Sequence, residues 1–211
     1  MKHKVTALRI QKNNQERVNV YLDGEFAFGL ARIVAAWLSV GQELSDEKIA
    51  QLQAEDNREV AYQRALHFMS FRVRTEKEVR KNLEAHSIPN EAIDLVIERL
   101  KKNGLLNDSY FAQSWVENRS DFRPRSKRVL AYELRSHGIE AQVIEDTLME
   151  LNEEELAYQA AIKQAKKLSG LDWVNFRKKL LAFLARRGFD YQVSASVTSA
   201  VWAEQQELYY E

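Results

Sequence analysis

The spacing of apolar residues changes near residue 45, and this change separates a strand-rich start from a helical remainder. The start holds three short runs of strand-forming residues, Val5–Ile10, Val18–Leu22 and Glu25–Phe28. Asp23-Gly24 separates the last two runs, and such a pair supplies the positive φ angles of a type I′ hairpin. We therefore expect a small β meander over residues 1–28, packed on a helix from Leu30 to Leu38.

The helical remainder repeats itself with a period near 50 residues. Leucines mark equivalent positions 51 and then 50 residues apart, at Leu83, Leu134 and Leu184. Five residues after each leucine comes a large apolar residue, Ile88, Ile139 or Phe189. Another amphipathic helix precedes each copy, near residues 56–71, 107–120 and 153–168. Such a period is typical of stacked helical modules, and each module here has three helices.

These patterns predict a mainly α protein, built as an elongated, curved array of three tandem three-helix repeats that resemble helix-turn-helix modules. A small N-terminal β meander precedes the array. The expected boundaries are 1–50 for the β segment with its helix, then 51–104, 105–151 and 152–211 for the repeats. The alternative is one compact helical bundle in which the repetition is accidental.

Composition narrows the class of protein. The 211 residues include 31 Lys and Arg, 31 Asp and Glu, and no Cys. The lack of cysteine excludes disulfides, thiolate metal sites and cysteine nucleophiles. No apolar run approaches the roughly 20 residues that a membrane-spanning helix needs. We expect a cytoplasmic protein without membrane contact.

The sequence offers little for catalysis. It holds no phosphate-binding loop, no dinucleotide-binding glycine motif, no zinc-protease motif and no serine-hydrolase elbow. The four histidines are too scattered for a zinc site, and His86 and His137 fit helix ends, where the dipole favours them. We therefore expect no enzymatic activity, no catalytic residue, no bound metal and no cofactor.

Charge is sorted by segment although the net charge is zero. Residues 72–81 carry five bases and two acids, residues 119–128 five bases and one acid, and residues 177–187 five bases and no acid, whereas residues 140–155 carry seven acids and no base. A single basic cluster is usually a solvated helix face. Recurrence near the middle helix of each repeat instead predicts a basic stripe that can follow a phosphate backbone. The candidate residues are Arg72, Arg74, Lys77, Arg80, Lys81, Arg123, Arg125, Lys127, Arg128, Arg177, Lys178 and Lys179.

Three stretches resemble the RecX family, bacterial regulators of the RecA recombinase. They are Arg72–Arg80, then Asn103-Gly-Leu-Leu-Asn-Asp108 with Phe111-Ala112 and Trp115–Arg119, then Leu130–Ile139 with its Glu-Leu-x-x-x-Gly-Ile end. The resemblance covers residues 55–205, and the N-terminal β segment is similar to the extension of some longer members. The family often has Gly-Pro before the second middle helix, whereas Arg123-Pro124 keeps only the proline. The match also adds Arg119 and Arg135 to the candidate contacts.

The resemblance implies an array that lies in the groove of the RecA–single-stranded-DNA filament and inhibits filament growth, ATP hydrolysis and strand exchange. It implies a role in recombination, DNA repair and the SOS response. The expected partners are the RecA filament and single-stranded DNA, with at most weak binding to duplex DNA, and we expect a monomer. The residues leave two alternatives open: a dimeric helix-turn-helix transcription factor, and a protein-interaction solenoid indifferent to nucleic acid.

Overall fold

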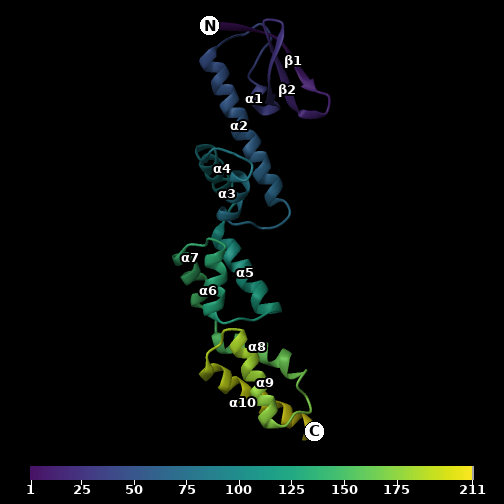
Figure 1. Cartoon of the computed structure of the whole chain (residues 1–211), viewed down its shortest axis with the longest axis vertical. Coiled ribbons are helices and arrows are strands. Elements are labelled where there is room, and N and C mark those ends of the chain that lie inside the picture. The colour runs from purple at the N-terminus through teal and green to yellow at the C-terminus, as the bar shows by residue number, and fades with distance from the viewer. Residues whose placement is uncertain (211) are drawn as a thin grey trace. The chain divides into compact units, whose positions relative to one another are not determined.

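The computed structural model describes the backbone of residues 1–210 and the side chains of residues 1–206. The chain forms two compact units, Met1–Leu106 and Asn107–Glu211. Unit 1 contains β1 (Lys2–Gln11), β2 (Asn14–Leu22), β3 (Glu25–Ala31), α1 (Arg32–Ala35), β4 (Glu43–Ser45), α2 (Asp46–Met69), α3 (Glu76–Glu84) and α4 (Asn90–Lys102) (Figure 1). Unit 2 contains α5 (Asp108–Phe122), α6 (Lys127–Ser136), α7 (Ala141–Met149), α8 (Glu153–Ala165), α9 (Trp173–Arg186) and α10 (Tyr191–Tyr210).

This order confirms a mainly helical chain with three tandem three-helix repeats after an N-terminal sheet. Repeat 1 is α2–α4, repeat 2 is α5–α7 and repeat 3 is α8–α10. In the part of the chain that the structure describes, no helix combines the length and apolar character needed to cross a bilayer.

The N-terminal sheet is antiparallel, with the strand order β3-β2-β1-β4. Asp23 and Gly24 both have positive φ, 51° and 95°, as the hairpin between β2 and β3 requires. Alternate residues face inward, so that Val5, Val20 and Leu30 are fully buried in one cluster with Leu44. The predicted meander is present.

One expectation for this segment was wrong, and one strand was missed. The helix predicted over Leu30–Leu38 is only the four residues of α1, because β3 continues to Ala31 and Leu30 pairs with Val18. The fourth strand, β4, was not predicted at all. It pairs with β1 through Lys2 and Ser45, and no local pattern indicates a partner so far along the chain.

Helix α2 belongs to both the sheet module and repeat 1. It begins at Asp46, because Ser45 caps it and accepts the N–H of Lys48 at 3.3 Å. The buried carboxylate of Asp56 accepts the N–H of Ala31 and pairs with Arg17 at 2.9 Å, which fixes α2 to the sheet. One turn later, Glu59 of α2 pairs with Arg99 of α4 at 2.7 Å. The expected boundary between residues 50 and 51 therefore lies inside α2.

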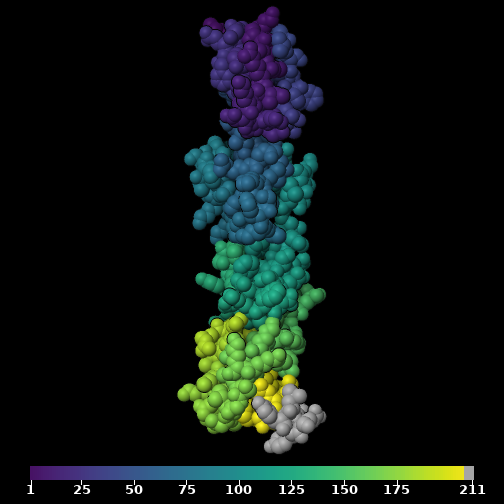
Figure 2. Space-filling model, turned by 90° about the vertical axis from the view of Figure 1, so that its right-hand side faces the viewer, coloured from purple at the N-terminus to yellow at the C-terminus, as the bar shows by residue number. Residues whose placement is uncertain are grey.

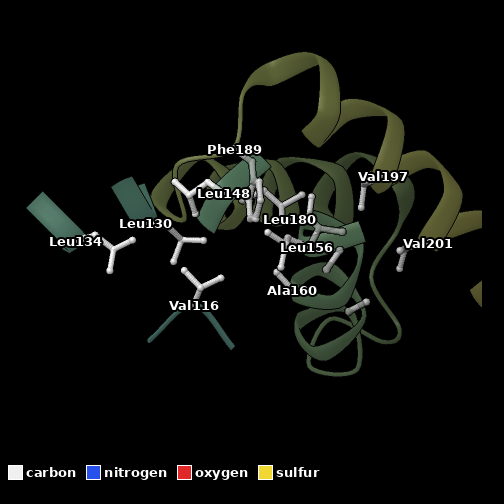
Figure 3. Packing of buried hydrophobic residues seen from close by; sticks show 14 of the residues in the cluster. Val116, Leu130, Leu134, Leu148, Leu156, Ala160, Leu180, Phe189, Val197 and Val201 are labelled. Atoms are coloured by element: carbon white, nitrogen blue, oxygen red, sulfur yellow. The ribbon is translucent and has the colours of Figure 1, made fainter. Parts of the chain in front are cut away.

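Each repeat closes around the leucine that marks the period. Leu83 is fully buried among α2, α3 and α4, whose side chains form a closely packed body, blue to teal in the space-filling view (Figure 2). Leu134 and Leu184 are also fully buried, and both belong to one continuous cluster of unit 2 (Figure 3). Repeats 2 and 3 therefore share a hydrophobic core.

The same left-handed turn ends the middle helix of every repeat. The carbonyls of Leu83, Leu134 and Leu184 accept N–H bonds from Ile88, Ile139 and Phe189 at 3.2, 3.1 and 3.2 Å. The residue before each donor has positive φ: Ser87 at 59°, Gly138 at 87° and Gly188 at 92°. This is the Schellman motif, and it turns the chain from the second helix into the third.

The turn of repeat 3 also fixes how repeats 2 and 3 meet within unit 2. The carbonyl of Arg187 accepts the N–H of Ser126 at 3.2 Å, so that the end of α9 lies against the start of α6. A Cβ atom at Gly188 would overlap the side chains of Val129 and Ser126. Glycine is thus needed here for its φ angle and for its lack of a side chain.

Ser87→Gly should stabilise unit 1. Ser87 holds a left-handed conformation that costs an L-residue about 1 kcal/mol and glycine almost nothing. Hydrogen exchange of the α3 and α4 amides should show slower opening by roughly that free energy. Ser136→Gly, at the last residue of α6 in unit 2, is the control and should leave exchange of the α3 and α4 amides unchanged. Faster exchange in Ser87→Gly would contradict the turn geometry.

Gly188→Ala should destabilise unit 2 more than Gly170→Ala. Both glycines have positive φ, but only Gly188 contacts another helix; around Gly170 there is open space. The extra loss should be about 1–3 kcal/mol, because the added methyl group forces α9 away from α6. Denaturation followed by tryptophan fluorescence measures it, since Trp115, Trp173 and Trp202 all lie in unit 2. Equal losses of unfolding free energy would show that the close approach of Gly188 to Val129 and Ser126 does not contribute to stability.

Candidate nucleic-acid interface

Buried N-caps position the basic segments of repeats 1 and 2. Thr75 and Ser126 are fully buried, and their hydroxyls accept the N–H groups of Glu78 and Val129 at 3.3 Å. An Arg-x-Arg segment precedes each cap at the same distance, Arg72–Arg74 in repeat 1 and Arg123–Arg125 in repeat 2. In repeat 3, Asp172 caps α9 and buried Phe176 takes the equivalent position, so the segment has no third copy.

Two of the predicted contact residues in repeat 1 are engaged by acids of the same repeat. Arg72 pairs with Glu78 at 2.8 Å. Arg80 pairs with Glu76 at 2.7 Å and with Asp94 at 2.6 Å, which joins α3 to α4. Hydrogen bonds to Glu76 and then Asp94 raise the pKa of Arg80. These two arginines hold the repeat together.

In repeat 2 the predicted contact residues Arg119 and Arg125 are engaged by one acid, Glu133. Its carboxylate accepts hydrogen bonds from Arg119 Nε and Trp115 Nε1, both at 2.8 Å, and lies 3.3 Å from Arg125 Nε. Burial by itself raises the pKa of Glu133, but the hydrogen bonds from Arg119 and Trp115 outweigh it and hold that pKa below its ordinary value. Arg119 also lies over the Trp115 ring, 4.3 Å from the centroid.

Three further predicted residues contact neutral groups. Arg74 lies over the ring of Phe68, Lys127 donates to the carbonyl of Met149, and Arg177 donates to the hydroxyl of Tyr191. Such contacts restrain a side chain without cancelling its charge.

The remaining predicted residues are exposed, and Lys77 is among them. Six have side chains without an ion pair or hydrogen bond to any residue that the structure describes, and we call them the exposed cation set: Lys81, Arg123, Arg128, Arg135, Lys178 and Lys179. Lys77, Arg128 and Lys178 each precede the marker leucine of their repeat by six residues. The recurrence is therefore real at one helical position, while the continuous stripe across both units stays a prediction.

Sequence reasoning missed two features of these segments. Arg187 was not among the predicted contacts, although its guanidinium donates to the carbonyl of Pro124 at 3.3 Å; the partners are 63 residues apart, so no local signal could indicate it. Phe71 and Phe122 are 70% and 73% exposed, and each directly precedes an Arg-x-Arg segment. The 51-residue offset that relates them could have been found from sequence.

Acidic and histidine side chains do not gather into a metal site. Among residues with described side chains, no three of His, Asp or Glu lie close enough together to hold an ion. His137 instead lies against the ring of Trp115, with centroids 4.5 Å apart, and His86 contacts the carbonyl of Asn82.

Family models match four successive parts of the chain. The regulatory protein RecX N-terminal domain matches residues 3–45, and the first, second and third three-helix domains of RecX match residues 61–100, 107–148 and 152–197.

Similar proteins and structures carry the same description. A regulatory protein RecX of Clostridium beijerinckii is 30% identical, over 95% of this chain and 96% of its own. One of Levilactobacillus brevis is 33% identical, over 93% of this chain and 76% of its own. A crystal structure of regulatory protein RecX superimposes with a TM-score of 0.75 at 27% identity, over 95% of this chain and 99% of the other. The RecX structure from Lactobacillus salivarius gives 0.61 at 26% identity, over 70% of this chain and 97% of the other.

Glu133→Gln should destabilise unit 2 by about 1–3 kcal/mol at neutral pH, because it removes the shared acceptor of charged hydrogen bonds. The pKa of Glu133 is lowered by folding, so its stabilisation is present above the ordinary value of 4.5 and is lost as pH falls below it. The difference in unfolding free energy between wild type and variant should therefore shrink below about pH 4.5. Urea denaturation at a series of pH values measures it.

Glu117→Gln is the matched control for that experiment. Glu117 is exposed on α5, and its side chain makes no ion pair or hydrogen bond to the described residues. Its replacement should change the unfolding free energy by less than about 0.5 kcal/mol at any pH. A pH-independent loss in Glu133→Gln would show that packing, and not the ion pair, is what the residue supplies.

Proposed function

The chain belongs to the RecX family of regulatory proteins, and from this premise we propose that it is a non-enzymatic regulator of the RecA recombinase. It binds the RecA–single-stranded-DNA filament as a monomer and inhibits filament extension, ATP hydrolysis and strand exchange. It thereby modulates recombination, DNA repair and the SOS response in the cytoplasm.

The observation that carries the proposal is the exposed cation set. Most cations near the middle helices satisfy acids or polar groups of their own repeat, whereas these six side chains have no such bond within the described residues. Five of the six lie in unit 2, on α6, on α9 or just before α6. An unpaired cation on a rigid helix keeps its charge for an external anion at little entropic cost.

The mechanism we propose is occupation of a surface and requires no chemical step. Repeats that each present a few cations make many weak contacts along a filament, and together these give a long residence time. A bound array then blocks the surface needed for subunit addition or for the second DNA strand. No catalytic residue and no cofactor take part.

The acidic segment of repeat 2 supports selectivity for a protein-coated filament. Residues 140–155 carry seven acids and no base, and the chain as a whole is neutral. These acids repel bare duplex DNA, which lowers non-specific binding. A filament presents DNA and protein together, so that cations and acids can each find a partner.

One observation weighs against the helix-turn-helix alternative. A reader of that class places basic or polar side chains of its last helix in the major groove. Helices α7 and α10 contain no lysine or arginine. In α4 the basic residues all lie in the last turn, where Arg99 pairs with Glu59 and Lys101 with Glu76. The protein-interaction solenoid differs in a measurable way, because its binding should respond little to salt.

The test is the DNA-dependent ATPase of RecA on preformed filaments. Addition of the wild-type chain should lower the rate at well below one chain per RecA subunit, since one array covers several subunits. Arg128→Ala with Lys178→Ala should weaken inhibition and reduce the log–log salt slope of binding by about 1.4, which is about 0.7 for each lost contact with a single strand.

Lys12→Ala with Lys48→Ala is the matched control. These lysines are exposed in the sheet module, outside the middle helices, and their removal changes the net charge by the same amount. The control should inhibit like wild type. If the wild-type chain left the ATPase unchanged at stoichiometric concentration, the proposal would fail.

A further inference from the structure

The Arg-x-Arg segments of repeats 1 and 2 are copies of one motif with different electrostatic surroundings. Residues 71–75 read Phe-Arg-Val-Arg-Thr, and residues 122–126 read Phe-Arg-Pro-Arg-Ser, at an offset of 51. Each has an exposed phenylalanine, two arginines and a buried N-cap hydroxyl. Repeat 1 therefore serves as an internal reference for repeat 2.

In repeat 1 the first arginine is neutralised from within. Arg72 pairs with Glu78 at 2.8 Å. The residue equivalent to Glu78 in repeat 2 is Val129, which faces Gly188 of the adjoining repeat. Arg123 thus has no acid at the place where Arg72 has one.

Repeat 3 then adds a further cation to the same place. Arg187 donates through Nη1 to the carbonyl of Pro124, the residue between the two arginines, at 3.3 Å. The Ser126 N–H bond to the carbonyl of Arg187 closes the contact from the other side. Arg123, Arg125 and Arg187, which we call the arginine triad, are held together at the junction of repeats 2 and 3.

The triad is short of negative charge. Among the described residues, Glu133 is the one carboxylate paired with it, and Glu133 already holds Arg119 and Trp115. The buried Nε of Arg125 has no hydrogen bond despite that pairing. Burial lowers the pKa of Arg187, and the charges of Arg125 and Arg123 lower it further. The folded chain therefore assembles three guanidinium groups against their mutual repulsion.

We propose that the arginine triad is a binding site for backbone phosphate of single-stranded nucleic acid, a role that rests on the DNA contact in the proposed function. Guanidinium groups bind phosphate oxygens through paired, charge-assisted hydrogen bonds, and a phosphate supplies the negative charge that the junction lacks.

Two neighbours favour a nucleic acid over an acidic protein segment. Phe122, 73% exposed, directly precedes the triad and offers a face on which a base can stack. Arg128, exposed on the first turn of α6, can take a successive phosphate, because a strand repeats its charge at regular intervals. An acidic peptide has no base to stack on Phe122 and no regular series of phosphates.

The experiment measures binding of the full chain to a fluorescent oligo(dT) at several salt concentrations. Arg123→Gln should lower the log–log salt slope by about 0.7, the value for one phosphate of a single strand, which corresponds to roughly fivefold weaker binding at 0.1 M salt. Arg72→Gln is the matched control, at the equivalent position in repeat 1. It should leave the slope unchanged, because Glu78 already occupies Arg72.

Arg187→Gln separates binding from structure. If the triad is a phosphate site, this variant should bind oligo(dT) about fivefold more weakly at 0.1 M salt. Its unfolding midpoint without DNA should change little, because the lost hydrogen bond to Pro124 is offset by the removal of a repulsive charge. A lower midpoint with an unchanged salt slope would assign Arg187 a purely structural role and overturn the proposal.

Two further outcomes are decisive. Poly-glutamate that binds as tightly as oligo(dT), with the same loss in Arg123→Gln, would overturn the assignment to nucleic acid. Equal salt slopes for Arg123→Gln and wild type, with normal inhibition of RecA by wild type, would overturn the triad and leave the proposed function intact. A triad-dependent slope in a chain that does not inhibit RecA would support the site and reject the proposed function.

Discussion

The left-handed turn after each middle helix is the constraint on which the rest of the structure depends. It satisfies the last carbonyls of the helix, and it brings the large apolar residue that follows back over the marker leucine. Because the third helix starts directly after this turn, its direction is fixed by one residue with positive φ. The same geometry in three places gives three similar modules, although Ser87 adopts it without the freedom of glycine.

In unit 2 the turn also brings two repeats together. Gly188 lets the end of α9 approach Ser126 and Val129, and Arg187, the residue before it, is carried to Pro124 by the same approach. A feature that ends a helix in repeats 1 and 2 thus builds a contact between modules in repeat 3. Hydrophobic packing completes that contact, since side chains of both repeats share one core.

The charged side chains of this protein interact mainly within their own repeat, although the net charge of the whole chain is zero. Within a repeat, acids such as Glu76 and Glu133 each serve more than one cation, and the bonds hold their pKa values low against the effect of burial. Cations outside these networks remain exposed near the middle helices. This division gives rigid modules through internal pairs and leaves exposed cations available for an external anion.

Local patterns in the sequence determined much of the fold. The Asp23-Gly24 hairpin depends on neighbours within a few residues, and the recurrence of Leu83, Leu134 and Leu184 is a repeat of one local helical pattern, so both could be predicted. The recurrence of basic segments was visible for the same reason.

Only the tertiary structure decided which parts of the chain meet. Strand β4 exists because β1 is there to pair with it, and α1 is short because β3 has a partner as far as Ala31. Arg119 is engaged by Glu133, and Arg187 reaches Pro124 across 63 residues. Charge alone does not tell an engaged arginine from an available one. That difference is set by contacts between distant segments, and the folded core is what creates them.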